Sequence, residues 1–435
     1  MNVRVGLRFR PLLVGLVAVS VGVSGGVPAS ASAEDELLPP TATPVGTFGG
    51  VSYVQYDGIF QGKTSTGAFR VPYRITAPAD SELGNRTVVV EPPHAAIGLG
   101  ALDLYLGRDM LFTRGFAHAG IGWSTTSFGP GFDNRILDPA VPGTFIDGGF
   151  ADDGGRTDNE IIVDFARALA VDQQAGAVLG KVARRYVTGV SDSSYPVMGL
   201  VTSGLAADVF DLAFPITTEW DDPQPAIDEG LYDGKLVIVN SEFDQSASLV
   251  DRGVAPGQYR FYAVAGTAHV PDFLEIPFFS SGSTPASFEP ALRAHFLQGD
   301  RWVRKGAPPP ASYHLKTTGG NEIERDANGN AITVNASGQS VPRLPFVELG
   351  EARFVTGFVG SYDGVKTIAD LGFGSHAAYL KAFKDMVKAY LSAGYILPDE
   401  AAVMRDRAAL CPPLTYTETY RDQYDDFVAI QPCSG

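Results

Sequence analysis

The stretch that decides the fold is RRYVTGVSDSSYPVMGLV, residues 184–201. It opens with β-branched and aromatic residues typical of a strand, reaches Gly189, presents Ser191, and continues with residues that a helix accepts. A strand, a sharp turn and a helix in this order can expose a serine hydroxyl as a nucleophile, in the pattern G-x-S-x-G. Here Ser193 replaces the last glycine. The stretch therefore predicts an α/β fold with Ser191 as its nucleophile.

Two alternatives compete with Ser191 as nucleophile. Ser124 lies in the similar pattern GWSTT, but the glycine- and proline-rich SFGPGFDNR that follows cannot supply the helix whose N-terminus favours an oxyanion. The residues after Ser191 can form that helix if Pro196 lies in its first turn, where proline is tolerated. The context favours Ser191, and a serine-rich turn without chemistry stays open as the other alternative.

A serine nucleophile needs a base to take its proton and an acid to orient that base. In this type of fold the acid and the histidine follow the serine in that order, each after a later strand. The apolar run KLVIVNS leads to Glu242 and Asp244, and YRFYAVAG leads to His269. We expect His269 to be the base. We expect Asp244 to be the acid because it lies further into its loop, with Glu242 as the alternative.

The oxyanion needs backbone N–H donors close to the nucleophile. One expected donor is the N–H of Asp192, directly after Ser191. The second half should come from the loop after the apolar run VVVEPP, which carries His94 and Ala95. We therefore expect the neighbourhood of His94 to supply a donor or a substrate contact, and His94 not to be the base.

The order of apolar runs predicts the architecture. Residues 47–275 open with an antiparallel pair and then alternate strands and helices, which indicates a mostly parallel sheet with helices on both faces. The alternation stops after His269, and residues 276–410 predict helices and a hairpin that form a C-terminal cap or appendage. The polar, proline-containing residues 34–46 predict a flexible leader.

The amino-terminal end of the chain carries a signal of export, and this bears on the two cysteines near the other end. Residues 1–33 combine three arginines, an apolar core and small residues up to Ala33, the pattern of a cleaved secretory signal. An exported chain meets an oxidising environment. We therefore expect the two cysteines, Cys411 and Cys433, to form a disulfide that ties residues 411–435 to the body of the protein.

The composition of the chain excludes several classes of binding partner. A net charge of −16 disfavours nucleic acid and anionic membranes, and no stretch after the signal is long and apolar enough to span a bilayer. The six histidines are scattered without metal-ligand spacing, so neither a metal nor a cofactor is expected. The expected partner is a small-molecule or polymeric ester substrate, and the sequence does not define the oligomeric state.

Several stretches resemble the alpha/beta hydrolase domain-containing proteins of bacteria. These are GVSDSS, where that family has a turn like G-I-S-Q-S-G, together with GFAHAGIGWS, VNSEFD, AGTAH and GSHAAYLKAFKDMVKAYLSAGYILPDEA. The likeness covers most of residues 48–408, and it implies an α/β-hydrolase fold with serine-dependent ester hydrolysis. The chain differs from the family at Asp192 and Ser194, which concerns the geometry around the oxyanion.

The expected function is hydrolysis of carboxylic esters. Ser191 would attack the carbonyl, His269 would act as base and then as acid, and Asp244 would hold the imidazole. A non-catalytic binding protein that kept the same fold is one alternative, and an amidase or peptidase with the same three residues is the other.

Overall fold

The computed structural model describes residues 35–94 except 66, 102–122, 136–137, 145–146, 159–270 except 220 and 254, and 286–410 except 319–321. Several predictions made from the sequence fall outside these ranges: the signal in residues 1–33, Ala95, Ser124, and the tail of residues 411–435 with Cys411 and Cys433. The described residues all belong to the unit Ala31–Gly435.

The described strands form one large sheet and two small ones. The large sheet contains β1 (Glu36–Leu37), β2 (Thr41–Phe48), β3 (Val51–Thr64), β4 (Gly67–Pro78), β5 (Thr87–Glu91), β6 (Ala117–Ile121), β9 (Arg184–Val190), β10 (Leu212–Ile216), β11 (Lys235–Ser241), β12 (Tyr259–Val264), β13 (Tyr313–Leu315) and β14 (Thr333–Asn335). The small sheets pair β7 (Ile136–Leu137) with β8 (Phe145–Ile146), and β15 (Arg353–Val355) with β16 (Ser361–Asp363).

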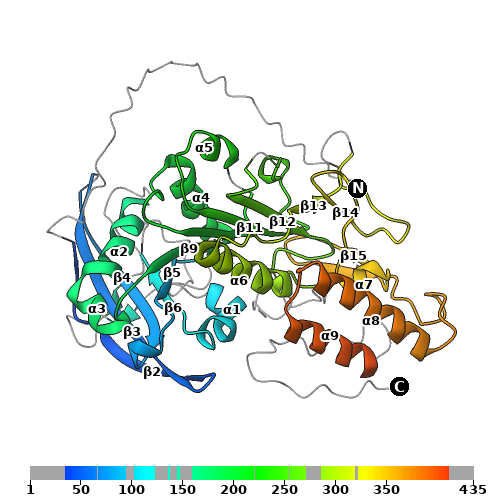
Figure 1. The fold of residues 1–435 in the computed structure, drawn as a ribbon, viewed down its shortest axis with the longest axis horizontal. Coiled ribbons are helices and arrows are strands. Elements are labelled where there is room, and N and C mark those ends of the chain that lie inside the picture. The colour runs from blue at the N-terminus through cyan, green and yellow to red at the C-terminus, as the bar shows by residue number, and fades with distance from the viewer. Residues whose placement is uncertain are drawn as a thin grey trace, which may run out of the picture. The chain divides into compact units, whose positions relative to one another are not determined.

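The large sheet is mostly parallel, as the sequence predicts. Its order is β1-β3-β4-β6-β5-β9-β10-β11-β12-β13-β14, and β2 pairs with β3 (Figure 1). Neighbouring strands from β6 to β13 are parallel, whereas β1, β3, β4 and β6 pair antiparallel, and so do β13 and β14. Because all its parallel neighbours point the same way, the loops after β9, β11 and β12 meet at one edge of the sheet.

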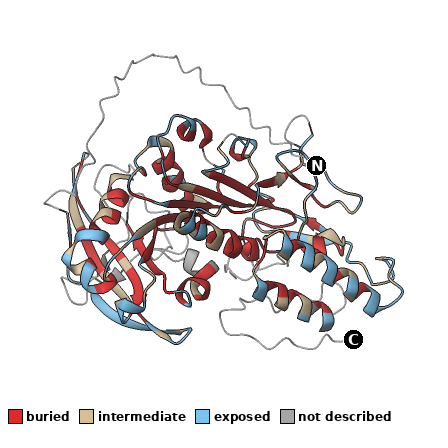
Figure 2. Cartoon of the chain, in the orientation of Figure 1, coloured by how far each residue is buried: buried red, intermediate tan, exposed pale blue. Residues whose placement is uncertain are grey.

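Nine helices are described: α1 (Leu102–Phe112), α2 (Asn159–Val171), α3 (Gln173–Leu179), α4 (Ser194–Ser203), α5 (Gln224–Asp228), α6 (Glu289–Lys305), α7 (Pro345–Glu348), α8 (His376–Ser392) and α9 (Pro398–Leu410). Figure 1 shows α4 and α5 on one side of the strands and α1 and α6 on the other. The strands between these layers are buried on both faces, which explains near-continuous apolar runs such as LVIV in β11 (Figure 2). Within the described ranges no helix is long and apolar enough to cross a membrane.

The amino-terminal segment differs from the flexible leader expected for residues 34–46. β1 and β2 pair antiparallel with β3, and the register shifts between Pro44 and Gly46. The side chains of β2 are almost all exposed, so the strand lacks the apolar alternation that would reveal it in the sequence. It is held by backbone hydrogen bonds at a sheet edge, where a proline is tolerated.

The helix α6 lies on the large sheet, although the sequence places it in the C-terminal appendage. Its Phe296 ring packs edge-on against Phe116, Tyr186 and Phe214, which belong to the core of the sheet. The buried Arg293 of the same helix pairs with Glu289 at 3.2 Å and with Glu400 of α9 at 2.5 Å. The segment after residue 275 therefore contributes a layer of the core as well as the outer helices α7 to α9.

A buried histidine on α6 joins this layer to β12. The His295 ring stacks on Tyr262, with ring centroids 3.5 Å apart and planes 2° from parallel. Its Nδ1 lies 2.9 Å from Oε1 of Gln298, and its Nε2 lies 3.3 Å from the hydroxyl of Tyr313. Burial lowers the pKa of His295 to about 3, so the folded protein keeps this ring neutral.

This histidine predicts acid sensitivity of the fold. Between pH ~6.5 and about 3 the unfolded chain binds a proton at His295 that the folded chain does not bind. The free energy of unfolding should therefore fall as the pH is lowered through this window, by up to about 1.4 kcal/mol per pH unit. Denaturant unfolding between pH 7 and 4 should show a shallower loss in His295→Gln than in the wild type. The exposed His376 supplies the matched control, and an equal change of slope in His376→Gln would contradict this account.

Candidate active site

Ser191 lies on the turn between β9 and α4, as the sequence predicts. Its φ is +56°, a left-handed conformation that non-glycine residues rarely adopt. A short 3₁₀ turn, Ser191–Ser193, leads directly into α4. Because α4 begins at Ser194, Pro196 falls in the first turn and removes no intrahelical hydrogen bond.

The residues around Ser191 explain why this turn needs one glycine and tolerates serine at the other end. A Cβ at Gly189 would come within 2.2 Å of the carbonyl oxygen of Ser193, so only glycine fits there. The hydroxyl of Ser193 accepts from the N–H of Val190 and donates to its carbonyl, each at 2.8 Å. Ser194 donates to the carbonyl of Ser191 at 2.5 Å. Ser193, in place of the last glycine of G-x-S-x-G, and Ser194, where the similar family has glycine, thus stabilise the turn through its own backbone.

The structure brings Ser191, His269 and Asp244 together. Nε2 of His269 lies 2.8 Å from Oγ of Ser191, and Nδ1 lies 2.6 Å from Oδ1 of Asp244. Asp244 follows β11 and His269 follows β12, so all three side chains meet at the carboxyl edge of the sheet. The Asp244 side chain is 4% exposed and that of His269 is 11% exposed, so bulk water barely reaches the acid. This is the hydrogen-bond chain that a serine nucleophile requires.

Two residues that sequence reasoning missed hold Asp244 in place. The Ser241 hydroxyl donates to Oδ2 of Asp244 at 2.5 Å, which leaves Oδ1 for the histidine. The buried Asn240 donates to the backbone carbonyl of Asp244 at 2.8 Å and to that of Thr218 at 2.6 Å. Both residues are polar and end an apolar strand directly before the loop of Asp244. Their position at the end of that strand could have identified them from the sequence.

Glu242, the alternative acid, does not reach His269 and makes a different set of contacts. Its buried carboxylate accepts from the backbone N–H of Gly266 at 2.6 Å, from Thr356 at 3.0 Å and from Arg325 at 2.8 Å. Its own N–H donates to the carbonyl of Thr267 at 3.2 Å. Glu242 therefore ties the loop of His269 to a segment from the C-terminal part of the chain.

That segment covers one face of the imidazole. The backbone N–H groups of His269 and Val270 donate to the carbonyls of Gly357 and Phe358, at 3.1 and 2.9 Å. The Phe358 ring stacks on His269 with centroids 4.7 Å apart and planes at 21°. The Phe243 ring lies edge-on to the imidazole, with centroids 6.2 Å apart. No local sequence pattern predicts that Phe358 stacks on His269.

The predicted oxyanion region is partly described. His94 approaches Asp192, with Nε2 3.0 Å from Oδ1, so the loop after β5 does reach the residue that follows Ser191. The Asp192 carboxylate also accepts from the N–H of Ser193 at 2.9 Å. Ala95 lies outside the described residues. The contact between His94 and Asp192 fixes the start of that loop beside Ser191.

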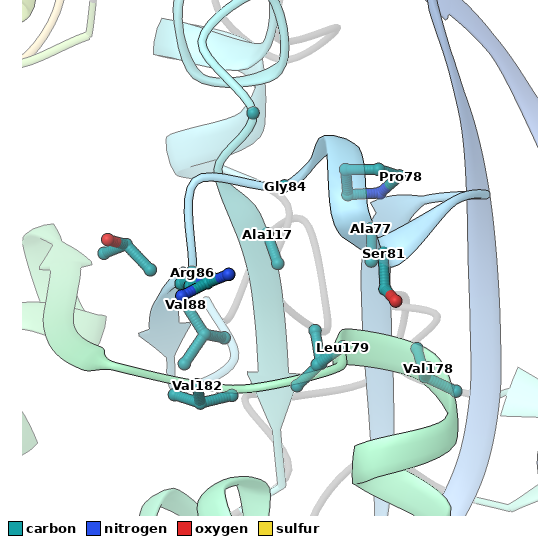
Figure 3. Close-up of a pocket in the computed structure, with 12 residues that line it drawn as sticks. Ala77, Pro78, Ser81, Gly84, Arg86, Val88, Ala117, Val178, Leu179 and Val182 are labelled. Carbon is teal, nitrogen blue, oxygen red and sulfur yellow. The ribbon is translucent and has the colours of Figure 1, made fainter.

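A pocket elsewhere in the molecule is separate from this site. It is lined at the amino ends of β5 and β6, by Val88 and Ala117 among others, and by Leu179 at the end of α3 (Figure 3). Ser191 follows the carboxyl end of β9, so the pocket lies at the opposite edge of the sheet. The described residues include no cluster of histidine, cysteine or carboxylate side chains that could hold a metal ion.

Comparisons with solved structures find distant likenesses. Candida antarctica lipase A in its closed state is 10% identical, over 63% of this chain and 83% of that chain, with a TM-score of 0.35. Acetyl xylan esterase 1 from a Thermoanaerobacterium species is 15% identical, over 48% and 73%, with a TM-score of 0.28. A siderophore hydrolase from Aspergillus nidulans is 14% identical, over 48% and 87%, also with a TM-score of 0.28.

A search of curated proteins finds no match. The comparison with protein families is more informative, because the family described as "Alpha/beta hydrolase domain" matches residues 54–406. The match includes the strand and helix around Ser191, both later loops and the segment that carries Phe358. The chain belongs to the alpha/beta hydrolase domain family.

Proposed function

We propose that this protein is a secreted serine hydrolase that cleaves carboxylic esters. The observation that carries the proposal is the continuous hydrogen-bond chain from Ser191 through His269 to Asp244, on a turn with a left-handed Ser191. The family supports hydrolysis in general, and the chemistry of these three groups suits an acyl transfer to serine.

The proposed reaction runs in two halves. His269 takes the proton of Ser191 as Oγ attacks the ester carbonyl, and Asp244 stabilises the imidazolium that forms. His269 then gives the proton to the departing alcohol oxygen, which leaves an acyl group on Ser191. In the second half a water molecule loses its proton to His269 and attacks the acyl carbonyl, and Ser191 is released with its proton restored.

The oxyanion of each tetrahedral intermediate would lie near the N-terminus of α4. The backbone N–H of Asp192 is one proposed donor, and the loop that begins at His94 is the proposed source of the other. The contact between His94 and Asp192 would keep the two halves at a fixed separation.

The first prediction from the proposed function concerns the nucleophile. A fluorophosphonate probe should label the purified protein at one residue, because a serine activated by a histidine attacks phosphorus readily. Ser191→Ala should lose all labelling, whereas Ser248→Ala, at an exposed serine whose hydroxyl contacts Ser246, should keep it. Intact-protein mass spectrometry measures both. An unlabelled wild type would favour the alternative of a non-catalytic binding protein.

The second prediction separates the two carboxylates. Asp244→Asn should lower kcat by about 10³- to 10⁴-fold, as in other enzymes where the amide imposes the wrong histidine tautomer. Glu242→Gln should lower kcat less than about 10-fold. It should reduce the free energy of unfolding by about 1 to 3 kcal/mol, because the amide nitrogen would face a donor in place of accepting from it.

Ester turnover and denaturant unfolding of both variants test this assignment. Glu324→Gln is the matched control, since Glu324 makes an exposed ion pair with Lys316 and should change neither quantity. A loss of kcat in Glu242→Gln as large as that in Asp244→Asn would contradict the assignment of Asp244 as the acid. Comparing an ester with the amide of the same acyl group distinguishes an esterase from an amidase.

The third prediction concerns export. Residues 1–33 and the two cysteines support secretion, so protein from the growth medium should begin at Glu34 and contain the bridge between Cys411 and Cys433. Peptide mapping without reduction measures both features. An intact amino terminus, or two alkylatable thiols, would contradict the respective part of this proposal.

A further inference from the structure

The exposed aromatic side chains of the described residues are concentrated at the candidate active site. Three are exposed: Tyr195 at 47%, Phe243 at 50% and Phe358 at 44%. Tyr195 lies four residues after Ser191, in the first turn of α4, and Phe243 directly precedes Asp244. Phe358 stacks on His269. Exposed aromatic rings cost solvation free energy, so their concentration here indicates a surface built for contact with a ligand.

Two of these rings, Phe243 and Phe358, come from segments that are far apart in the sequence. Phe243 belongs to the loop that carries Asp244. Its backbone N–H donates a hydrogen bond to the hydroxyl of Ser241 at 3.1 Å. Phe358 follows Thr356, which is bonded to the buried Glu242, and its carbonyl accepts from Val270 at 2.9 Å. Both backbones are therefore fixed while both rings stay half exposed. This preorganisation favours the binding of a rigid partner.

The location of the two rings decides which part of the substrate they contact. His269 gives its proton to the oxygen of the departing alcohol, so the alcohol group must lie next to the imidazole. The imidazole has Phe358 on one face and Phe243 at its edge. A group attached to the departing oxygen would therefore lie close to these two rings.

We propose that Phe243 and Phe358 form an alcohol-group subsite that selects esters of aryl or arylmethyl alcohols. This inference rests on the proposed hydrolase function. A flat aromatic ring can pack against one phenyl face and the edge of the other, in the stacked and edge-on arrangements that aromatic pairs prefer. A saturated ring of the same carbon number buries similar apolar area but lacks these arrangements.

The experiment compares benzyl acetate with cyclohexylmethyl acetate, because the two share an acyl group and release alcohols of similar size and basicity. The wild type should show a kcat/KM for the benzyl ester that is roughly 3- to 10-fold higher. Phe358→Leu, which keeps an apolar side chain, should lower this ratio. The double variant with Phe243→Leu and Phe358→Leu should bring it close to one. Melting temperatures of the variants verify that they fold.

The matched control is Val171→Ala, an exposed apolar residue that ends α2, and it should keep the wild-type ratio. A wild-type ratio near one, or a ratio that survives in the double variant, would overturn the subsite. In both cases continued labelling of Ser191 by the fluorophosphonate leaves the hydrolase function standing. Absence of labelling and of hydrolysis of either ester in the wild type would overturn the function and the subsite together.

Discussion

The close approach of the Ser193 carbonyl to Gly189 is the constraint on which the candidate site depends. The chain can turn back over the end of β9 only because residue 189 lacks a side chain. The turn places Ser191 at a positive φ, a conformation that costs on the order of 1 to 3 kcal/mol for a non-glycine residue. The internal hydrogen bonds of Ser193 and Ser194 offset part of this cost. The serines at positions 193 and 194 therefore add hydrogen bonds to the turn that glycine could not make.

A second centre of organisation is the buried carboxylate of Glu242. It joins three segments, since it accepts from the histidine loop at Gly266, from Thr356, and from Arg325. A buried charge with a cation and two neutral donors is well satisfied, whereas the same carboxylate without them would be costly. Two acids that are two residues apart on one loop thus have different partners: Asp244 contacts the histidine itself, and Glu242 contacts the backbone that carries it.

The sequence was most informative where the determinants are local. The turn at Ser191 and the loops of Asp244 and His269 each follow a strand that the sequence pattern predicts, so the polar residue after each strand can be located from the sequence. β2 could not be predicted in this way, because an exposed edge strand takes its pairing from β3 and not from its own residues. An amphipathic helix such as α6 fits any apolar face, so its pattern did not reveal which layer it covers. The contact of Phe358 with His269 depends on long-range pairing that no local pattern encodes.

The bond between Arg325 and Glu242 has a consequence for how this chain can be divided. A fragment that ended after α6 would still contain Ser191, Asp244 and His269, and would look complete by its motifs. It would also bury the Glu242 carboxylate without its cation, and it would lack the backbone that accepts from His269 and Val270. The smallest fragment that keeps the candidate site intact therefore cannot be defined by the motif residues alone. In a chimaera with a related chain, the loop of Glu242 and Asp244 should be exchanged together with the segment from Arg325 to Phe358, because hydrogen bonds join the two.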